Sequence, residues 1–128
     1  MIRSIDHLVI TVASVEATCA FYTRALGLRR LDEPNLPTAL LFGNQKINVH
    51  EVTRTFEPKS KTPTPGSADF CLIADRPLAD IEAHLKSCGV AIEAGPVPRT
   101  GALGKMMSVY FRDPDFNLVE VSEYRAQS

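Results

Sequence analysis

His7, His50 and Glu120 are polar residues that lie within short apolar segments of the chain. A buried imidazole or carboxylate needs a partner to offset the loss of its hydration. Two imidazoles and one carboxylate on a rigid sheet would form a site for Zn²⁺, Mn²⁺, Fe²⁺, Co²⁺ or Ni²⁺, with positions left open for water or substrate. The alternative is that both histidines are core residues bonded to the backbone, and that Glu120 pairs with Arg112 or Arg99.

His50 and Glu51 are adjacent, and only one of them can face a given side of a regular strand. Asn48 shares the face of His50, whereas Ile47 and Val49 share the face of Glu51. If Ile47 and Val49 face a helix layer, His50 faces the open side of the sheet. We therefore favour His50 over Glu51 as a metal ligand, and a bulge in the strand would reverse this choice.

A cluster of cationic and aromatic residues indicates where an anionic substrate would bind. Arg99 and Lys105 lie in or beside residues 95–104, a stretch rich in glycine and proline that is expected to be a loop, and Tyr110 follows it. Flexible glycines with nearby cations suit a lid that clamps an anionic group. Alternatively, the two cations are solvated loop charges, and Tyr110 packs with its hydroxyl hydrogen-bonded.

Hydrophobic periodicity predicts two helices and eight strands that would position these residues. The helices are expected at residues 15–26 and 77–88, where apolar side chains recur every three or four residues. His84 lies off the apolar face of the second helix and is expected at the surface. The strands are expected at residues 5–12, 28–31, 38–42, 46–52, 68–74, 90–93, 107–111 and 118–122.

The order of elements repeats after a polar linker at residues 53–67. The expected helix ends, Gly27 and Gly89, are 62 residues apart. Internal repetition on this scale is typical of units that cannot bury a sheet face alone and must pair. We therefore predict an α+β fold and a single domain, in which two tandem βαβββ modules, about 4–52 and 68–123, form a curved mixed sheet around an apolar cup.

Composition excludes several classes of function. The 128 residues carry 14 basic and 15 acidic side chains, for a net charge of −1, which argues against a protein that binds duplex nucleic acid. No apolar run approaches the length of a membrane span. The three cysteines are an odd and widely spaced set, which fits reduced thiols in the cytosol. We expect a soluble cytoplasmic protein.

Three motifs resemble the vicinal oxygen chelate superfamily, which includes glyoxalase I, bleomycin resistance proteins, fosfomycin resistance enzymes and extradiol dioxygenases. They are Asp-His-Leu-Val-Ile at 6–10, Phe-Tyr-x-x-x-Leu-Gly at 21–27 and Phe-Arg-Asp-Pro-Asp-x-Asn-Leu-Val-Glu at 111–120. The likeness covers nearly the whole chain. Residues 43–51 more narrowly resemble the proteins named glyoxalase domain-containing protein 5.

The resemblance implies paired βαβββ modules and one divalent metal ion, and it leaves open which of Zn, Ni, Mn, Co and Fe this is. It implies that the metal binds adjacent substrate oxygens and stabilises developing negative charge. His7 and Glu120 match ligands of the family, and His50 is the favoured third ligand. Glu120 and Glu51 are the candidate catalytic carboxylates, Glu51 because it resembles the glutamate that glyoxalase I uses on this strand.

Many members of the superfamily place a further ligand, a histidine, in the first strand of the second module. The offset of 62 residues maps His7 to Asp69, and a shift of two residues gives Cys71. Asp69 is therefore a weaker candidate ligand. Cys71 is weaker still, because a buried thiol in the core is the common fate of such a cysteine.

These expectations favour a divalent-metal-dependent, glyoxalase-like lyase or isomerase acting on a small, oxygen-bearing substrate, with Arg99, Lys105 and Tyr110 as substrate contacts. The alternatives are an Fe(II) extradiol-type dioxygenase and a non-catalytic protein that sequesters a drug, as bleomycin resistance proteins do. A homodimer is expected from the resemblance and from the open sheet edges of small modules. Neither nucleic acid nor a membrane is an expected partner.

Overall fold

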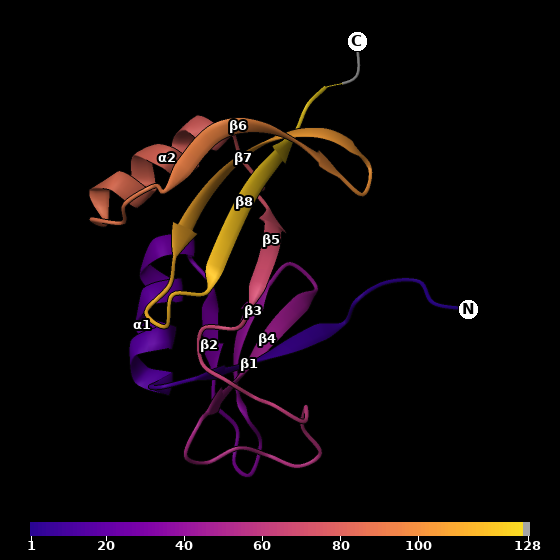
Figure 1. Cartoon of the computed structure of the whole chain (residues 1–128), viewed down its shortest axis with the longest axis vertical. Coiled ribbons are helices and arrows are strands. Elements are labelled where there is room, and N and C mark those ends of the chain that lie inside the picture. The colour runs from indigo at the N-terminus through magenta and orange to yellow at the C-terminus, as the bar shows by residue number, and fades with distance from the viewer. Residues whose placement is uncertain (127–128) are drawn as a thin grey trace. The chain divides into compact units, whose positions relative to one another are not determined.

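The computed structural model describes residues 1–126. These residues divide into two compact units, with the boundary between Ala68 and Asp69; we call them unit 1 and unit 2. In each unit a strand, a helix and three further strands follow one another along the chain (Figure 1). The predicted α+β fold with two βαβββ modules is therefore confirmed.

Unit 1 is built on a four-stranded sheet with the spatial order β1-β4-β3-β2. β1 runs parallel to β4, and the other neighbouring strands are antiparallel. β1 is therefore an edge strand that is paired on one side only. The elements are β1 (His7–Val12), α1 (Val15–Leu26), β2 (Arg29–Leu31), β3 (Thr38–Phe42) and β4 (Gln45–Glu51).

Unit 2 repeats this connectivity in a sheet with the order β5-β8-β7-β6. Its first strand, β5, is again the edge strand and runs parallel to the last strand, β8. The two units therefore place the same parallel pair, first strand beside last strand, at one edge of the sheet. The elements are β5 (Asp69–Ile73), α2 (Leu78–Ser87), β6 (Ala94–Gly101), β7 (Gly104–Arg112) and β8 (Leu118–Tyr124).

Alternation along the strands gives the sheet of unit 1 two different faces. The face toward α1 is apolar, and the opposite face, which we call the open face, carries His7, Val9, Asn48 and His50. The buried core of unit 1 includes Ile10, Val12, Cys19, Tyr22, Ala25, Leu40, Ile47 and Val49. Burial of this apolar surface is the main force that fixes which residues face the helix.

The sheet of unit 2 is divided in the same way. Its helix face is apolar and its open face is polar, with Ser108, Tyr110, Glu120 and Ser122 in neighbouring positions of β7 and β8. The buried core of unit 2 includes Leu78, Leu85, Val109, Phe111, Val119 and Val121. Each unit thus holds its apolar side chains beneath a helix and its polar side chains on the open face.

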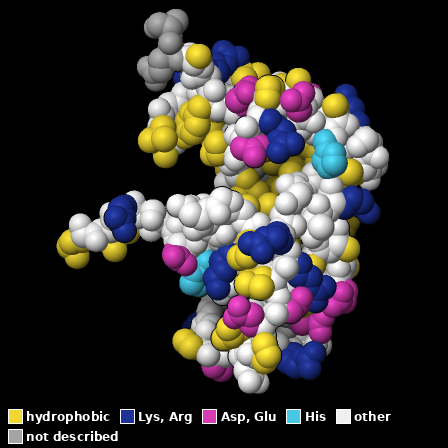
Figure 2. Space-filling model, turned by 180° about the vertical axis from the view of Figure 1, so that it is seen from behind, with side chains coloured by type: hydrophobic (Ala, Val, Ile, Leu, Met, Phe, Trp, Pro, Cys, Tyr) yellow, Lys and Arg dark blue, Asp and Glu magenta, His cyan; other side chains and the backbone are white. Residues whose placement is uncertain are grey.

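The face of the molecule that Figure 2 shows carries both signs of charge. Lys and Arg side chains are interspersed with Asp and Glu over the face that Figure 2 shows. This mixture agrees with the net charge of −1. Among the described residues, neither helix is long and apolar enough to cross a membrane.

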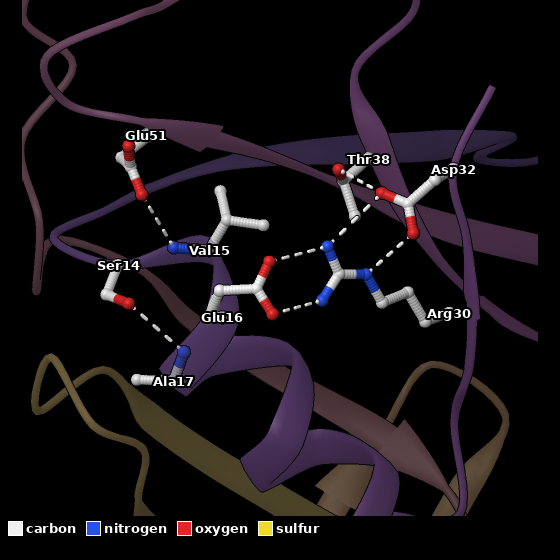
Figure 3. Close-up of polar contacts among 8 residues, drawn as sticks. All are labelled: Ser14, Val15, Glu16, Ala17, Arg30, Asp32, Thr38 and Glu51. Carbon is white, nitrogen blue, oxygen red and sulfur yellow. Dashed lines mark hydrogen bonds and ion pairs between the residues drawn. The ribbon is translucent and has the colours of Figure 1, made fainter. Parts of the chain in front are cut away.

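The first turn of α1 makes hydrogen bonds with Ser14, which precedes it, and with Arg30 of β2. Ser14 Oγ accepts a hydrogen bond from the backbone N–H of Ala17 at 3.1 Å and so acts as the N-cap of the helix. Arg30 of β2 binds Glu16 of the helix through two hydrogen bonds, of 2.7 and 2.9 Å, and also binds Asp32 (Figure 3). Its guanidinium lowers the pKa of both carboxyls through these hydrogen bonds.

Unit 2 differs from the sequence-based expectation between α2 and β7. No strand occurs at residues 90–93, and β6 (94–101) covers most of the loop that was expected at residues 95–104. The glycine and proline signals mislead because pairing with β7 compensates for the low strand propensity of these residues. A register shift between Ala94 and Val97 accommodates the Gly-Pro pair between them.

The Asp-Pro-Asp-x-Asn segment forms the turn that leads into β8. The buried carboxylate of Asp113 accepts hydrogen bonds from the backbone N–H groups of Asp115 and Asn117, at 2.9 and 3.0 Å, and from Asn117 Nδ2 at 2.8 Å. This turn therefore sets where β8 begins, and with it the position of Glu120. The role of the motif is therefore structural: its hydrogen bonds stabilise the turn that precedes Glu120.

We expect Asp113→Ala to lower the free energy of unfolding by about 3 kcal/mol, because it leaves buried N–H groups without an acceptor. Chemical denaturation at neutral pH measures this change. Asp75→Ala is the matched control: Asp75 is an exposed residue whose ion pair with Arg76 contributes little. Equal stability of the two variants would contradict the structural role of the motif.

Candidate functional site

Glu120 presents a carboxylate on the open face of unit 2. Its Oε2 atom accepts hydrogen bonds from Ser108 Oγ at 2.6 Å and from Ser122 Oγ at 3.1 Å, and both serines are fully buried. Arg112 pairs with Glu93 instead, and Arg99 hydrogen-bonds to Tyr110. In the described part of the chain Oε1 has no hydrogen-bond partner, so one oxygen is held and the other is available.

The serine hydroxyls and the thiol of Cys71 form a chain that ends at Glu120. Ser108 Oγ and Ser122 Oγ are 2.6 Å apart, and Cys71 Sγ is 3.1 Å from Ser122 Oγ. Each hydroxyl has one proton and an ionised carboxylate only accepts. Partial burial is the largest cause that raises the pKa of the Cys71 thiol, so the thiol stays protonated. The single protons of Ser108 and Ser122 therefore go to Glu120, and the Cys71 thiol is left as a donor to Ser122 Oγ.

Tyr110 lies directly across from Glu120 in the register of β7 and β8. Its hydroxyl accepts a hydrogen bond from Arg99 Nε at 2.8 Å, and the guanidinium lies 5.3 Å from the ring centroid. Because the tyrosine oxygen accepts from Arg99, its own proton remains available to another acceptor. These two predicted substrate contacts therefore lie on the open face of unit 2 together with Glu120.

Lys105 lies away from the other two predicted substrate contacts. It pairs with Thr100, one position beyond the pair of Arg99 and Met106. Alternation therefore directs Lys105 to the face of the hairpin opposite Arg99. The expected flexible lid at residues 95–104 is instead a paired β-hairpin whose two cations point to different sides.

His7 is exposed at the start of β1, where burial was expected. Its Nδ1 is 2.8 Å from the carboxylate of Asp6. Because an ionised carboxylate only accepts, this contact favours the neutral tautomer with the proton on Nδ1, in which Nε2 is the acceptor. A carboxylate behind one ring nitrogen is the arrangement that orients histidine ligands of metals. His7 is thus an accessible imidazole with the second nitrogen free to bind.

His50 lies in a different environment, at the other end of the parallel pair. It is 5% exposed, and its ring centroid is 5.3 Å from that of Phe56, a residue of the linker. Burial, and secondly the charge of Lys59, lower the pKa of His50. The imidazole is therefore neutral near pH 7.

The register of β1 and β4 separates the two histidines. His7 pairs with Lys46, and His50 pairs with Thr11, four positions further along. At about 3.3 Å per residue, this is about 13 Å along the strands. Unit 1 therefore does not bring His7 and His50 around one ion. Among the described residues, no group of three or more His, Cys, Asp and Glu side chains has metal-binding geometry.

Glu51 points to the helix side of the sheet, on the face opposite His50. Its Oε1 accepts a hydrogen bond from the backbone N–H of Val15, at 3.1 Å (Figure 3). Val15 is the first residue of α1, so the carboxylate also lies at the positive end of the helix dipole. The position of Glu51 is explained by helix capping.

Asn48 is a polar residue of the open face that sequence reasoning placed there but did not select. It is 8% exposed, and among the described residues its buried Oδ1 has no hydrogen-bond partner. The signal that could have identified it is the alternation of β4, which puts Asn48 two positions before His50. A single sequence does not show that its oxygen lacks a partner.

The sequence model of the Glyoxalase/Bleomycin resistance protein/Dioxygenase superfamily matches residues 4–121. The virulence protein STM3117 of Salmonella typhimurium (strain LT2) is 48% identical over 97% of this chain and 86% of that protein. Glyoxalase domain-containing protein RDO1 of Mycosarcoma maydis is 47% identical over 97% of this chain and 70% of that protein. The chain belongs to the Glyoxalase/Bleomycin resistance protein/Dioxygenase superfamily.

Solved structures show the same fold. The crystal structure of STM3117 from Salmonella typhimurium gives a TM-score of 0.95 at 47% identity and covers 98% of this chain and 99% of that one. A lactoylglutathione lyase from Agrobacterium tumefaciens (TM-score 0.71, 24% identity, covering 94% and 92% of the two chains) shares the fold alone. So does TnmS3, an antibiotic binding protein from Streptomyces sp. CB03234 (0.77, 21%, 97% and 98%).

The depressed pKa of His50 predicts a specific pH dependence of stability. The folded state disfavours protonation of His50. Below the ordinary pKa of 6.5 the unfolded state therefore binds a proton more readily than the folded state does. The free energy of unfolding then decreases as the pH falls below that value. We expect the free energy of unfolding to decrease less between pH 7.5 and pH 5 in His50→Gln than in the original protein. If the free energy of unfolding of the two proteins decreased by the same amount between these pH values, burial of His50 would have no energetic consequence.

Helix capping by Glu51 also has a measurable consequence. We expect Glu51→Ala to lower the free energy of unfolding by about 1 kcal/mol, because it removes an acceptor and a negative charge from the start of α1. Glu51→Gln keeps an acceptor and should lose less. Thermal or chemical unfolding measures both, and full stability of Glu51→Ala would contradict the capping role.

Proposed function

We propose that this protein is a divalent-metal-dependent, glyoxalase-like lyase or isomerase that acts on a small, oxygen-bearing substrate. The observation that carries the proposal is the state of Glu120: two buried serine hydroxyls hold one carboxylate oxygen, and the other is free on the open face. Membership of the superfamily supports a metal role for this residue. The family resemblance, which matches His7 and Glu120 to family ligands, is the reason for proposing both for one ion.

The candidate residues differ in how well they are placed to act as metal ligands. Glu120 offers an oxygen oriented by its serine partners, and His7 offers Nε2 with Asp6 behind the ring. His50 stays neutral, as a ligand must, but the register separates it from His7. A divalent ion bound by Glu120 and His7 would stabilise negative charge that develops on a substrate oxygen.

Tyr110 and Arg99 are the proposed substrate contacts on unit 2. The Tyr110 hydroxyl, which accepts from Arg99, can donate its proton to a substrate oxygen beside Glu120. Arg99 keeps a positive charge at this place, which would favour an anionic group on the substrate. Glu120 is also placed to accept a proton through Oε1, which makes it the candidate catalytic base when it is not fully engaged by the metal.

Metal binding tests this proposal directly. We expect purified protein, freed of metal and then titrated with Zn²⁺, Mn²⁺, Co²⁺ and Ni²⁺, to bind about one ion per chain. Glu120→Gln and His7→Gln should each weaken binding at least about tenfold to a hundredfold, the range seen even for groups that only support metal ligands. Isothermal titration and elemental analysis measure the effect.

Glu123→Gln is the matched control, since Glu123 is on the same strand with its side chain directed to the other face. A protein that takes up none of these ions would contradict the proposal. It would then belong with ligand-sequestering members of the superfamily. Preference for Fe²⁺ together with oxygen consumption would instead favour the dioxygenase alternative.

We also propose that the protein forms a homodimer. β1 and β5 are edge strands that are each paired on one side only, and such edges invite further pairing.

A further inference from the structure

We infer that unit 1 binds the carboxylate of a small organic anion between Arg29 and Lys46. The two cations line a hollow of about 240 Å³ at the end of the sheet where β1 and β4 begin. Its lining also includes Asp6, Leu41 and the β3–β4 turn at residues 43–44. The site lies wholly within unit 1 and needs no metal ion, so it does not depend on the proposed function.

The register of the sheet places Arg29, Leu41 and Lys46 in one row. Arg29 of β2 pairs with Leu41 of β3, and Leu41 pairs with Lys46 of β4. Paired residues point to the same side of a sheet, so all three side chains lie on the open face. Two strand spacings separate the backbones of Arg29 and Lys46 by about 10 Å. The row therefore carries a cation at each side and an apolar residue in the centre.

Neither cation is neutralised by an acidic partner of the protein. Within residues 1–126, Arg29 and Lys46 form no ion pair. The next residue of β2, Arg30, points to the helix side and pairs with both Glu16 and Asp32. Alternation along β2 thus gives one arginine to the carboxylates of unit 1 and leaves its neighbour available to an anion from solution.

The charges of the hollow limit the charge of the ligand. Asp6 lies in the lining, and its carboxylate is already the partner of His7 Nδ1, at 2.8 Å. Arg29 and Lys46 supply two positive charges and Asp6 one negative charge, so the lining has a net charge of 2 − 1 = +1. One carboxylate balances this charge. A phosphate dianion would leave excess negative charge beside Asp6.

The shape of the groups also favours an organic carboxylate. The guanidinium of Arg29 offers a planar set of donors that matches the two oxygens of a carboxylate, and the ammonium of Lys46 adds a point charge. Leu41 is partly buried, so it offers apolar contact to a chain attached to the carboxylate. Gln45 Nε2 donates a hydrogen bond to the carbonyl oxygen of Ile5, at 2.7 Å, and this contact fixes one wall of the hollow.

Titration of the metal-free protein with short carboxylates tests the inference. In a two-dimensional amide spectrum, butyrate and hexanoate should shift the backbone signals of Leu41 and Lys46, and the neutral analogue butyramide should not. Hexanoate should bind about fourfold more tightly than butyrate, about twofold for each partly buried methylene. Inorganic phosphate should bind more weakly than butyrate. The affinity for butyrate should fall as salt is added, because salt screens exposed charges.

Substitutions assign the binding to the two cations. Arg29→Gln and Lys46→Gln should each weaken butyrate binding at least about tenfold, because each removes a hydrogen bond between charged groups. Arg29→Lys keeps the charge but not the planar donors, and should lose less. Leu41→Ala should abolish the preference for hexanoate. Lys61→Gln is the matched control: it removes the same charge from an exposed residue of unit 1 outside the hollow, and should leave the affinity unchanged.

The outcomes are distinct from those of the proposed function. Butyrate binding that Arg29→Gln and Lys46→Gln leave unchanged would overturn the inference, as would unshifted Leu41 and Lys46 signals in the original protein, a readout that needs no variant to fold. Tighter binding of phosphate than of butyrate would overturn the carboxylate assignment. Failure in this metal-free test leaves the proposed function standing. A protein that binds butyrate as expected but takes up no divalent ion would support this inference and contradict the proposed function.

Discussion

The parallel pairing of the first and last strands in each unit is the constraint on which the candidate site depends. Across a parallel pair, partners point to the same side of the sheet, and successive residues point to opposite sides. In unit 2 this places Val119 and Val121 against α2 and leaves Glu120 on the open face. A slip of one residue would exchange these faces and bury a carboxylate in an apolar core. Hydrophobic packing on the helix side of the sheet therefore fixes which side chain, Glu120, lies on the open face.

The two open faces show two ways of keeping a polar group in a largely apolar module. Glu120 is accompanied by Ser108 and Ser122, whose hydroxyls satisfy one oxygen and fix the direction of the other. Within residues 1–126, Oδ1 of Asn48 has no such partner. Since an unsatisfied acceptor lowers stability, a fold selected for stability alone would place an apolar residue there. Sites that break a local rule of this kind are where function is expected.

Sequence patterns predicted most of the fold because the information they use is local. The apolar residues that recur every three or four positions and the repeat that relates Gly27 to Gly89 are visible in the chain, and they place both helices. The misplaced strand at residues 90–93 has a different origin: β6 is stabilised by pairing with β7, a contact that local propensity does not include. Propensity failed where tertiary pairing decided the structure.

The candidate site was harder to predict for the same reason. Alternation correctly separates His50 from Glu51, because it is a property of one strand. The distance between His7 and His50 depends on the register between two strands that are far apart in sequence. Nothing in either segment alone sets that register. Residue type singled out His50 as the favoured third ligand, whereas the register separates it from His7.

His50 nevertheless has a physical place in this arrangement. Burial and the nearby charge of Lys59 keep its imidazole neutral, and Phe56 packs against the ring. A protonated imidazole on the open face of unit 1 would repel a cation there, and in a partly buried place that repulsion is only weakly screened. A neutral ring avoids the repulsion and still leaves one donor and one acceptor for water or substrate. The same burial that hides His50 from solvent therefore makes the open face of unit 1 more favourable to a cation.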